Sequence, residues 1–183
     1  FADFRNRLNS AKKLKSKNFI PAIAIHSPYS VHPFLVRETL NLARAENLAV
    51  SSHFLESPEE FAWLHKDEGS FLDFFKNFLG QEKAVSTPME FLNLFSNIKN
   101  LSFTHCVEAS EADLEKIRNL GASINHCVTS NRILNNSKLD LSRLKDIPFT
   151  IGPDGLSSNN SLSMFDELRN ALMIHSNENI VDF

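Results

Sequence analysis

The chain has 183 residues, 42% of them hydrophobic and 22% charged, which is typical of a globular domain with its own core. A formal net charge of −3 gives no basic surface, so we expect no nucleic-acid partner. The sequence contains no apolar run of about 18 residues and opens with no signal-peptide pattern. We therefore expect a cytoplasmic protein without membrane contact, with residues 1–183 in a single domain.

The first half of the chain predicts two strands and the helices around them. Apolar runs predict strands over 19–26 and 48–54, and Pro33 predicts a helix to about Asn47 between them. A capping hydroxyl followed by proline and glutamate predicts another helix start at Ser57. Phenylalanines at helical spacing over 71–78 predict a further helix. We favour packing of this helix against the fold, with a lid over a substrate as the alternative.

The second half repeats the same alternation. Thr87 and Ser110 each predict a helix start, and a last helix is expected from Asn160 or Ser161 to Ile174. Apolar runs predict three more strands, at residues 101–106, 121–127 and 147–152. The runs are continuous rather than alternating, as in parallel strands that are covered on both faces. The sequence therefore predicts an α/β fold with a parallel sheet.

The apolar runs end on side chains that bind metals or transfer protons: His26, His53, His105, His126 and, shortly after the last run, Asp154. The carboxyl ends of the strands of a parallel barrel meet at one mouth, which predicts a shared site. A single histidine of this kind is more often a hydrogen-bonded core residue. Five such endings together favour a functional site.

His53 and Glu56 form the most informative local pair. Glu56 must lie in the loop after the strand to share a site with His53, because side chains three apart on a strand point to opposite faces. An imidazole beside a carboxylate suits metal-assisted hydrolysis, in which the carboxylate moves a proton of water. The alternative is that Glu56 only assists the helix that starts at Ser57.

Three further histidine and aspartate positions fit the same chemistry. His105 is expected to orient the attacking water or to stabilise developing charge, and His26 to donate to a substrate heteroatom. Asp154 precedes a loop of small polar residues, which we expect to hold its carboxylate against a metal; the alternative is a simple turn, since an Asp-Gly pair alone is usually that.

Two cysteines, Cys106 and Cys127, each follow a histidine. We expect buried, unpaired thiols, with a Cys/His zinc site as a weaker alternative.

Several segments together resemble the amidohydrolase superfamily, in particular the adenosine, S-adenosylhomocysteine and chlorotriazine hydrolases. These segments are HSPYS (26–30), HFLES (53–57), THCVE (104–108), HCVTSNR (126–132) and DGLSSNNSLSMFDELR (154–169). HFLES and SPYSVHP are similar to the 6-aminodeoxyfutalosine deaminases of menaquinone biosynthesis. The resemblance implies a (β/α)8 TIM-like barrel, of which this chain covers about strands 4 to 8. It also implies one divalent metal, zinc or iron, a small-molecule substrate, and a homodimer as the common assembly.

The resemblance also implies roles for individual residues. His53 and Asp154 correspond to metal ligands, Glu56 to the proton shuttle and a substrate contact, His105 to the water-orienting residue and His26 to a substrate contact. His126, Ser130, Asn131 and Asn159 are implied to support the site structurally. The implied reaction is release of ammonia from an aminopurine nucleoside. Adenosine, S-adenosylhomocysteine or guanine deaminases, chlorohydrolases and a non-catalytic truncated barrel that binds a partner chain remain as alternatives.

The sequence departs from the family pattern in two places. The family takes its first two metal ligands from a His-x-His motif, and none occurs in these residues. We therefore expect the chain to be a portion of a longer polypeptide that carries the motif upstream. Pro153 stands where the family usually has a small hydroxyl residue, and proline constrains the backbone next to Asp154.

Overall fold

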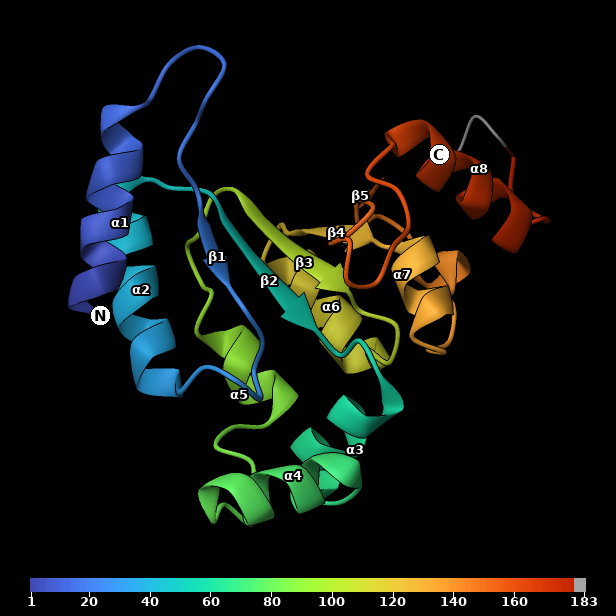
Figure 1. Ribbon diagram of the computed structural model, residues 1–183, viewed down its shortest axis with the longest axis horizontal. Coiled ribbons are helices and arrows are strands. Elements are labelled where there is room, and N and C mark those ends of the chain that lie inside the picture. The colour runs from blue at the N-terminus through green and yellow to red at the C-terminus, as the bar shows by residue number, and fades with distance from the viewer. Residues whose placement is uncertain (180–183) are drawn as a thin grey trace.

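The computed structural model describes residues 1–179, which form a curved α/β structure around one parallel sheet (Figure 1). The strands lie in the order of the sequence, and all neighbours are parallel. They are β1 Ile23–Ile25, β2 Val50–Phe54, β3 Leu101–His105, β4 Ser123–His126 and β5 Phe149–Ile151. The predicted α/β class and all five predicted strands are confirmed.

The first strand is shorter than the predicted 19–26. Ladder bonding begins where the Ile23 amide donates to the Ala49 carbonyl at 2.9 Å. Pro21 has no amide hydrogen to donate to a ladder, and Phe19 pairs instead with Ser16 in an isolated antiparallel bridge. The apolar run therefore begins before the strand does.

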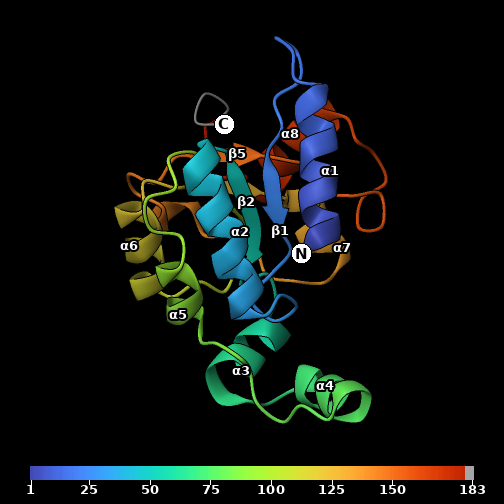
Figure 2. The ribbon, with the colours of Figure 1, turned by 90° about the vertical axis from the view of Figure 1, so that its left-hand side faces the viewer.

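Eight α-helices and one 3-10 turn are found within residues 1–179. They are α1 Ala2–Lys13, α2 Pro33–Glu46, α3 Pro58–Lys66, α4 Ser70–Leu79, α5 Pro88–Asn93, α6 Glu111–Asn119, α7 Val128–Ile133, η1 Leu141–Arg143 and α8 Met164–Ile174. Helices α2, α5 and α6 lie on one side of the sheet (Figure 2). The apolar core fills the space between these helices and the sheet. Phe95, for example, packs edge-on against Phe103 of β3 at 5.1 Å between ring centroids. In this part of the chain no helix has the length and apolar character needed to cross a membrane.

The predicted helix starts are confirmed at α3, α5 and α6, where Ser57, Thr87 and Ser110 are the N-caps. The start of α8 was predicted at Asn160 or Ser161, and this is wrong. The helix begins at Met164, because Asn159 Oδ1 accepts the Ser161 amide and holds a turn there. Ser163 then caps the helix by accepting the amide of Asp166.

Helix α4 confirms the predicted helix over 71–78 and packs through one face only. Phe75 is buried and stacks on Trp63 of α3 at 5.2 Å between ring centroids. Phe74 and Phe78 of the same helix are exposed. Helices α3 and α4 lie beyond the carboxyl ends of β1 and β2, away from the layer of α2, α5 and α6 (Figures 1 and 2).

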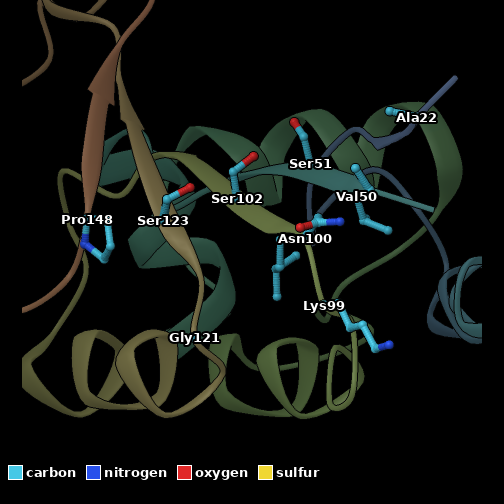
Figure 3. A pocket seen from close by; sticks show the side chains of 11 residues that line it. Ala22, Val50, Ser51, Lys99, Asn100, Ser102, Gly121, Ser123 and Pro148 are labelled. Atoms are coloured by element: carbon cyan, nitrogen blue, oxygen red, sulfur yellow. The ribbon is translucent and has the colours of Figure 1, made fainter. Parts of the chain in front are cut away.

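The second face of the sheet is polar rather than apolar, so the prediction of strands covered on both faces is wrong for these residues. Burial alternates along β2, and Ser51, Ser102 and Ser123 line a cavity of about 490 Å³ on this face (Figure 3). Most of the other lining residues, such as Lys99 and Pro148, stand before the strands begin, and Val50 and Leu101 are the first residues of β2 and β3. This cavity is therefore at the amino end of the sheet, opposite to the end that carries the histidines.

Candidate active site

Three of the strand-end histidines form a row at the carboxyl edge of the sheet. The ring of His26, after β1, lies 5.2 Å from that of His53 in β2. The ring of His53 in turn stacks on that of His105 in β3 at 5.3 Å, with 22° between the planes. The predicted gathering of strand ends therefore brings these three imidazoles together.

The ring of His53 is oriented by the backbone of the neighbouring strand. Its Nδ1 donates a hydrogen bond to the carbonyl oxygen of His26 at 2.9 Å. This bond selects the tautomer in which Nε2 carries the lone pair. A backbone carbonyl on the far nitrogen is the arrangement usually found for histidines that bind metals.

His105 is fully buried and points its second nitrogen at two carboxylates. Its Nδ1 donates to Asn131 Oδ1 at 2.8 Å. Its Nε2 lies 3.5 Å from Glu56 Oε2 and 4.0 Å from Asp154 Oδ2, with no hydrogen-bond partner among residues 1–179. Burial lowers the pKa of His105 more than the nearby carboxylates raise it. The neutral ring of His105 then directs the lone pair of Nε2 toward the carboxylates of Glu56 and Asp154. Since all three groups are acceptors, only a hydrogen-bond donor or a cation between them satisfies them.

Asp154 is held in the site by two hydroxyl groups. Ser130 Oγ donates to Asp154 Oδ2 at 2.7 Å, and Ser158 Oγ donates to the same oxygen at 3.0 Å. Burial acts to raise the pKa of Asp154, but these hydrogen bonds, together with His105 and the backbone of Gly155, outweigh it and the pKa is lowered. Asp154 itself has φ 60°, and Asn159 Nδ2 fixes the preceding turn by donating to the Pro153 carbonyl at 2.7 Å. The carboxylate is therefore charged and fixed near neutral pH.

Glu56 lies beyond β2, as its spacing from His53 requires. Its Oε1 accepts from Asn136 Nδ2 at 3.4 Å, and its side chain is 22% exposed. Ser57, not Glu56, caps α3 by accepting the Glu60 amide at 3.2 Å. Glu56 is thus available for chemistry beside His105.

His126 takes a different direction from the row of imidazoles. Its Nε2 lies 2.9 Å from His175 Nε2, at the end of α8. Burial is the main cause that lowers the pKa of His126 to about 3, and the neighbouring His175 lowers it further. The ring is therefore neutral near pH 7, and it packs between β4 and α8 instead of joining His53 and His105.

Several residues of the site were not predicted from sequence. Ser158 and Asn136 contact Asp154 and Glu56, but a serine or asparagine in a polar loop carries no distinctive signal. Glu167 accepts from the Thr129 amide at 2.9 Å and from Asn159, and so joins α8 to the site loop. Glu60 follows Ser57 by three residues, and this spacing predicts a helix cap. The capping pattern gave no reason to connect Glu60 with Glu56.

The donor groups of this chain fit part of a metal site. His53 Nε2 and the charged Asp154 are typical ligands of zinc and iron. No set of three or more His, Cys, Asp and Glu side chains in residues 1–179 is arranged to hold a metal ion. Cys106 and Cys127 are buried and free, as predicted, and form no Cys/His zinc site. Residues 1–179 thus supply suitable donors, but too few of them for a complete site.

Two curated deaminases are similar to this chain over nearly all of its residues. The aminodeoxyfutalosine deaminase of Nitratiruptor sp. is 44% identical over 183 residues, which is 100% of this chain and 45% of that protein. The adenosine deaminase of Helicobacter pylori is 34% identical over 180 residues, covering 94% of this chain and 44% of that protein. The chain therefore spans less than half the length of these curated relatives.

Two solved deaminase structures have the same fold as this chain. The crystal structure of H. pylori aminofutalosine deaminase in complex with methylthio-coformycin matches 99% of this chain and 46% of its own, with a TM-score of 0.91 and 31% identity. An adenosine deaminase from Xanthomonas campestris with bound zinc matches at a TM-score of 0.74 and 24% identity, which shows the fold alone. The predicted barrel-type hydrolase fold is thereby confirmed, with five parallel strands in this chain.

The family comparison covers almost every residue. The Amidohydrolase family profile matches residues 2–182, and this family generally uses a divalent metal. With this match and the 44% identical relative, the chain belongs to the amidohydrolase family.

Proposed function

We propose that this chain is part of a metal-dependent aminohydrolase that releases ammonia from 6-aminodeoxyfutalosine, an aminopurine nucleoside of menaquinone biosynthesis. The observation that carries the proposal is the buried Nε2 of His105, which lies 3.5 Å from Glu56 and 4.0 Å from Asp154. Such a group of one neutral base and two carboxylates is suited to holding and deprotonating water. The 44% identical aminodeoxyfutalosine deaminase of Nitratiruptor sp. supports the choice of substrate.

In this proposal the metal is held by His53 and Asp154, together with ligands from outside residues 1–183. When bound, a divalent metal lowers the pKa of water and makes it a nucleophile near neutral pH. His105 Nε2 and Glu56 Oε2 are close enough to contact the same water molecule. His105 accepts a hydrogen bond from that water and so orients its oxygen toward the substrate.

Glu56 carries the proton in the proposed reaction. Its carboxylate takes a proton as the water oxygen bonds to the purine carbon that bears the amine. It then gives that proton to the amine, the carbon–nitrogen bond breaks, and ammonia leaves. One water is consumed and the purine gains an oxygen where the amine was, so the atoms balance.

His26 is proposed to contact the substrate. It is exposed at the mouth of the site, and its Nδ1 lies 2.5 Å from Ser30 Oγ and 3.0 Å from Ser27 Oγ. Burial of part of the ring and the neighbouring His53 lower its pKa. The two serines hold the ring, and Nε2 is directed toward a substrate heteroatom.

The second candidate function is hydrolysis of another substrate by an enzyme of the same fold. The 34% identical adenosine deaminase of H. pylori favours adenosine as the alternative. S-adenosylhomocysteine, guanine and chlorinated triazines require the same strand-end residues, so these residues do not separate them. The remaining alternative is a non-catalytic barrel that binds a partner chain. If the complete gene product lacked an upstream His-x-His motif, that result would favour this alternative over the enzyme.

We further propose a single zinc or iron ion, a cytoplasmic location and a homodimer. The histidine and carboxylate donors support the metal, and the two free thiols support a reducing compartment. Metal analysis, cell fractionation and the solution mass of the complete protein test these three statements.

The function is tested with the complete, metal-loaded gene product. Ammonia release is measured with 6-aminodeoxyfutalosine, adenosine and S-adenosylhomocysteine side by side. We expect 6-aminodeoxyfutalosine to have the highest kcat/KM. Preferred turnover of adenosine would replace the substrate but keep the reaction, whereas no turnover of any of the three with metal bound would contradict the proposed deaminase.

A further inference from the structure

A buried carboxyl group lies directly behind the proposed proton shuttle. Glu60, in the first turn of α3, is 1% exposed, and its Oε1 has no hydrogen-bond partner within residues 1–179. Its Oε2 accepts a hydrogen bond from the backbone amide of Glu56 at 2.9 Å. Burying a carboxyl group is costly, and this one is placed where it contacts the backbone of the site.

The same capping pattern occurs at two other helices, where it serves the helix alone. In α5 the Thr87 amide donates to Glu90 Oε2 at 2.8 Å, and in α6 the Ser110 amide donates to Asp113 Oδ2 at 2.9 Å. In both helices the carboxylate returns to the amide of its own N-cap residue. Glu60 instead reaches one residue further back, past Ser57 to Glu56. Helix capping alone does not account for this contact.

The hydrogen bond from Glu56 completes a clamp on one peptide group. The carbonyl of Leu55 accepts from the Glu108 amide at 2.9 Å, while the amide of Glu56 donates to Glu60. These two groups belong to the same peptide unit, between Leu55 and Glu56. The unit follows a strained position, since Leu55 has φ 45°, a left-handed conformation that leucine rarely adopts. The clamp thus fixes the turn by which β2 leads into α3 (Figure 1).

We propose that Glu60 is a positioning residue for Glu56, in that its buried carboxyl group fixes the Leu55–Glu56 peptide and thereby the direction of the Glu56 side chain. The inference rests on the proposed function, because it assigns Glu60 to the reaction that Glu56 performs. Of the two groups that hold this peptide, only Glu60 acts through its side chain, because Glu108 contributes its backbone amide. A displacement of about 1 Å at a reacting group is enough to reduce turnover by about 100-fold.

The test compares four variants of the complete metal-loaded enzyme. Glu60→Ala removes the acceptor, Glu60→Asp withdraws the carboxyl group by one methylene, and Glu60→Gln supplies an amide acceptor of the same length. Glu90→Ala is the matched control, because it removes the equivalent capping carboxylate of α5, away from the site. For each variant kcat, KM, thermal stability and hydrogen exchange of the Glu56 amide are measured.

We expect Glu60→Ala and Glu60→Asp to lower kcat by about tenfold or more, with KM changed less than about twofold. The Glu56 amide should exchange faster in both. Glu60→Gln should retain kcat within about threefold, since its amide oxygen accepts the same hydrogen bond. Glu90→Ala should keep the kcat of the wild type. If Glu60→Ala does not fold, Glu60→Asp and Glu60→Gln still give the comparison.

Three results would overturn the inference while leaving the proposed function intact. These are an unchanged kcat in folded Glu60→Ala or Glu60→Asp, an equal loss of kcat in Glu90→Ala, or a Glu60→Gln variant as slow as Glu60→Asp. A wild-type enzyme that releases no ammonia from any aminopurine nucleoside would refute the proposed function and the inference with it. The wild-type measurement therefore separates the two failures.

Discussion

Replacement of Ser130 by alanine tests how the site holds Asp154. Ser130 is fully buried in α7, and its hydroxyl donates to Asp154 Oδ2 at 2.7 Å. The same hydroxyl lies 2.9 Å from that of Ser158, which also donates to Asp154 Oδ2, at 3.0 Å. Alanine removes the shorter of the two hydrogen bonds and leaves the longer one. The carboxylate then loses part of the support that keeps it charged and oriented toward His105.

The expected size of the effect follows from the nature of this bond. A hydrogen bond to a charged group contributes about 1.5–3 kcal/mol. Since about 1.4 kcal/mol corresponds to a tenfold change in an equilibrium constant, full loss would weaken metal binding by about 10-fold to 100-fold. Ser158 remains bonded to the same oxygen, so we expect a value near the lower limit.

The assay is a competition between the complete protein and a chelator of known affinity. Ser157→Ala is the control, because Ser157 is an exposed hydroxyl in the same loop. We expect Ser130→Ala to bind metal about tenfold more weakly and Ser157→Ala to bind as the wild type does. Wild-type affinity in a folded Ser130→Ala variant would refute the role of Asp154 as a ligand supported by Ser130.

Three further predictions concern the shuttle, acid stability and the aromatic helix. Glu56→Gln should retain metal but lower ammonia release by about 100-fold to 10,000-fold, because proton transfer is lost; near-normal turnover would exclude the shuttle role. The pKa of His126 is lowered from 6.5 to about 3, so between these values the unfolded chain binds a proton that the folded chain does not. The free energy of unfolding should therefore fall as pH is lowered through this window, and urea titrations should show a shallower fall in His126→Gln; an identical pH slope would contradict this account. Phe75→Ala should cost about 3–5 kcal/mol because Phe75 is buried against Trp63, whereas Phe78→Ala, at a side chain 74% exposed, should change stability by less than about 0.5 kcal/mol in the same urea assay. Equal losses in these two variants would mean that α4 packs differently.

Local patterns in the sequence determine most of the fold. Three helix starts carry a hydroxyl and a carboxylate three residues apart, and all three form as predicted. Apolar runs between them place the strands, because the crossover helices of a parallel sheet cover its strands and favour apolar side chains in them. The same runs predict that His26, His53 and His105 meet, since the carboxyl ends of parallel strands share one edge of the sheet.

Contacts between distant segments decide what each strand-end residue does. His105 is in register with Phe54, a core residue, yet its ring stacks on His53 on the other side. Its φ of 72° interrupts the alternation of side chains that the strand pattern predicts. His126 follows the same sequence pattern as His105, but α8 brings His175 to within 2.9 Å of it. The sequence identified both histidines, and only the packing of α8 and the backbone at His105 separated their environments.

The contacts to the two carboxylates also depend on the tertiary structure. Asn136 lies 80 positions from Glu56 in the chain, and Ser130 lies 24 positions from Asp154. No local periodicity predicts such pairs, because they arise where loops after different strands converge. The sequence by itself therefore determined the strands, the helix starts and the chemical types at the mouth of the sheet. The directions and protonation states of those groups were decided by tertiary packing, since burial and hydrogen bonds from distant segments set them.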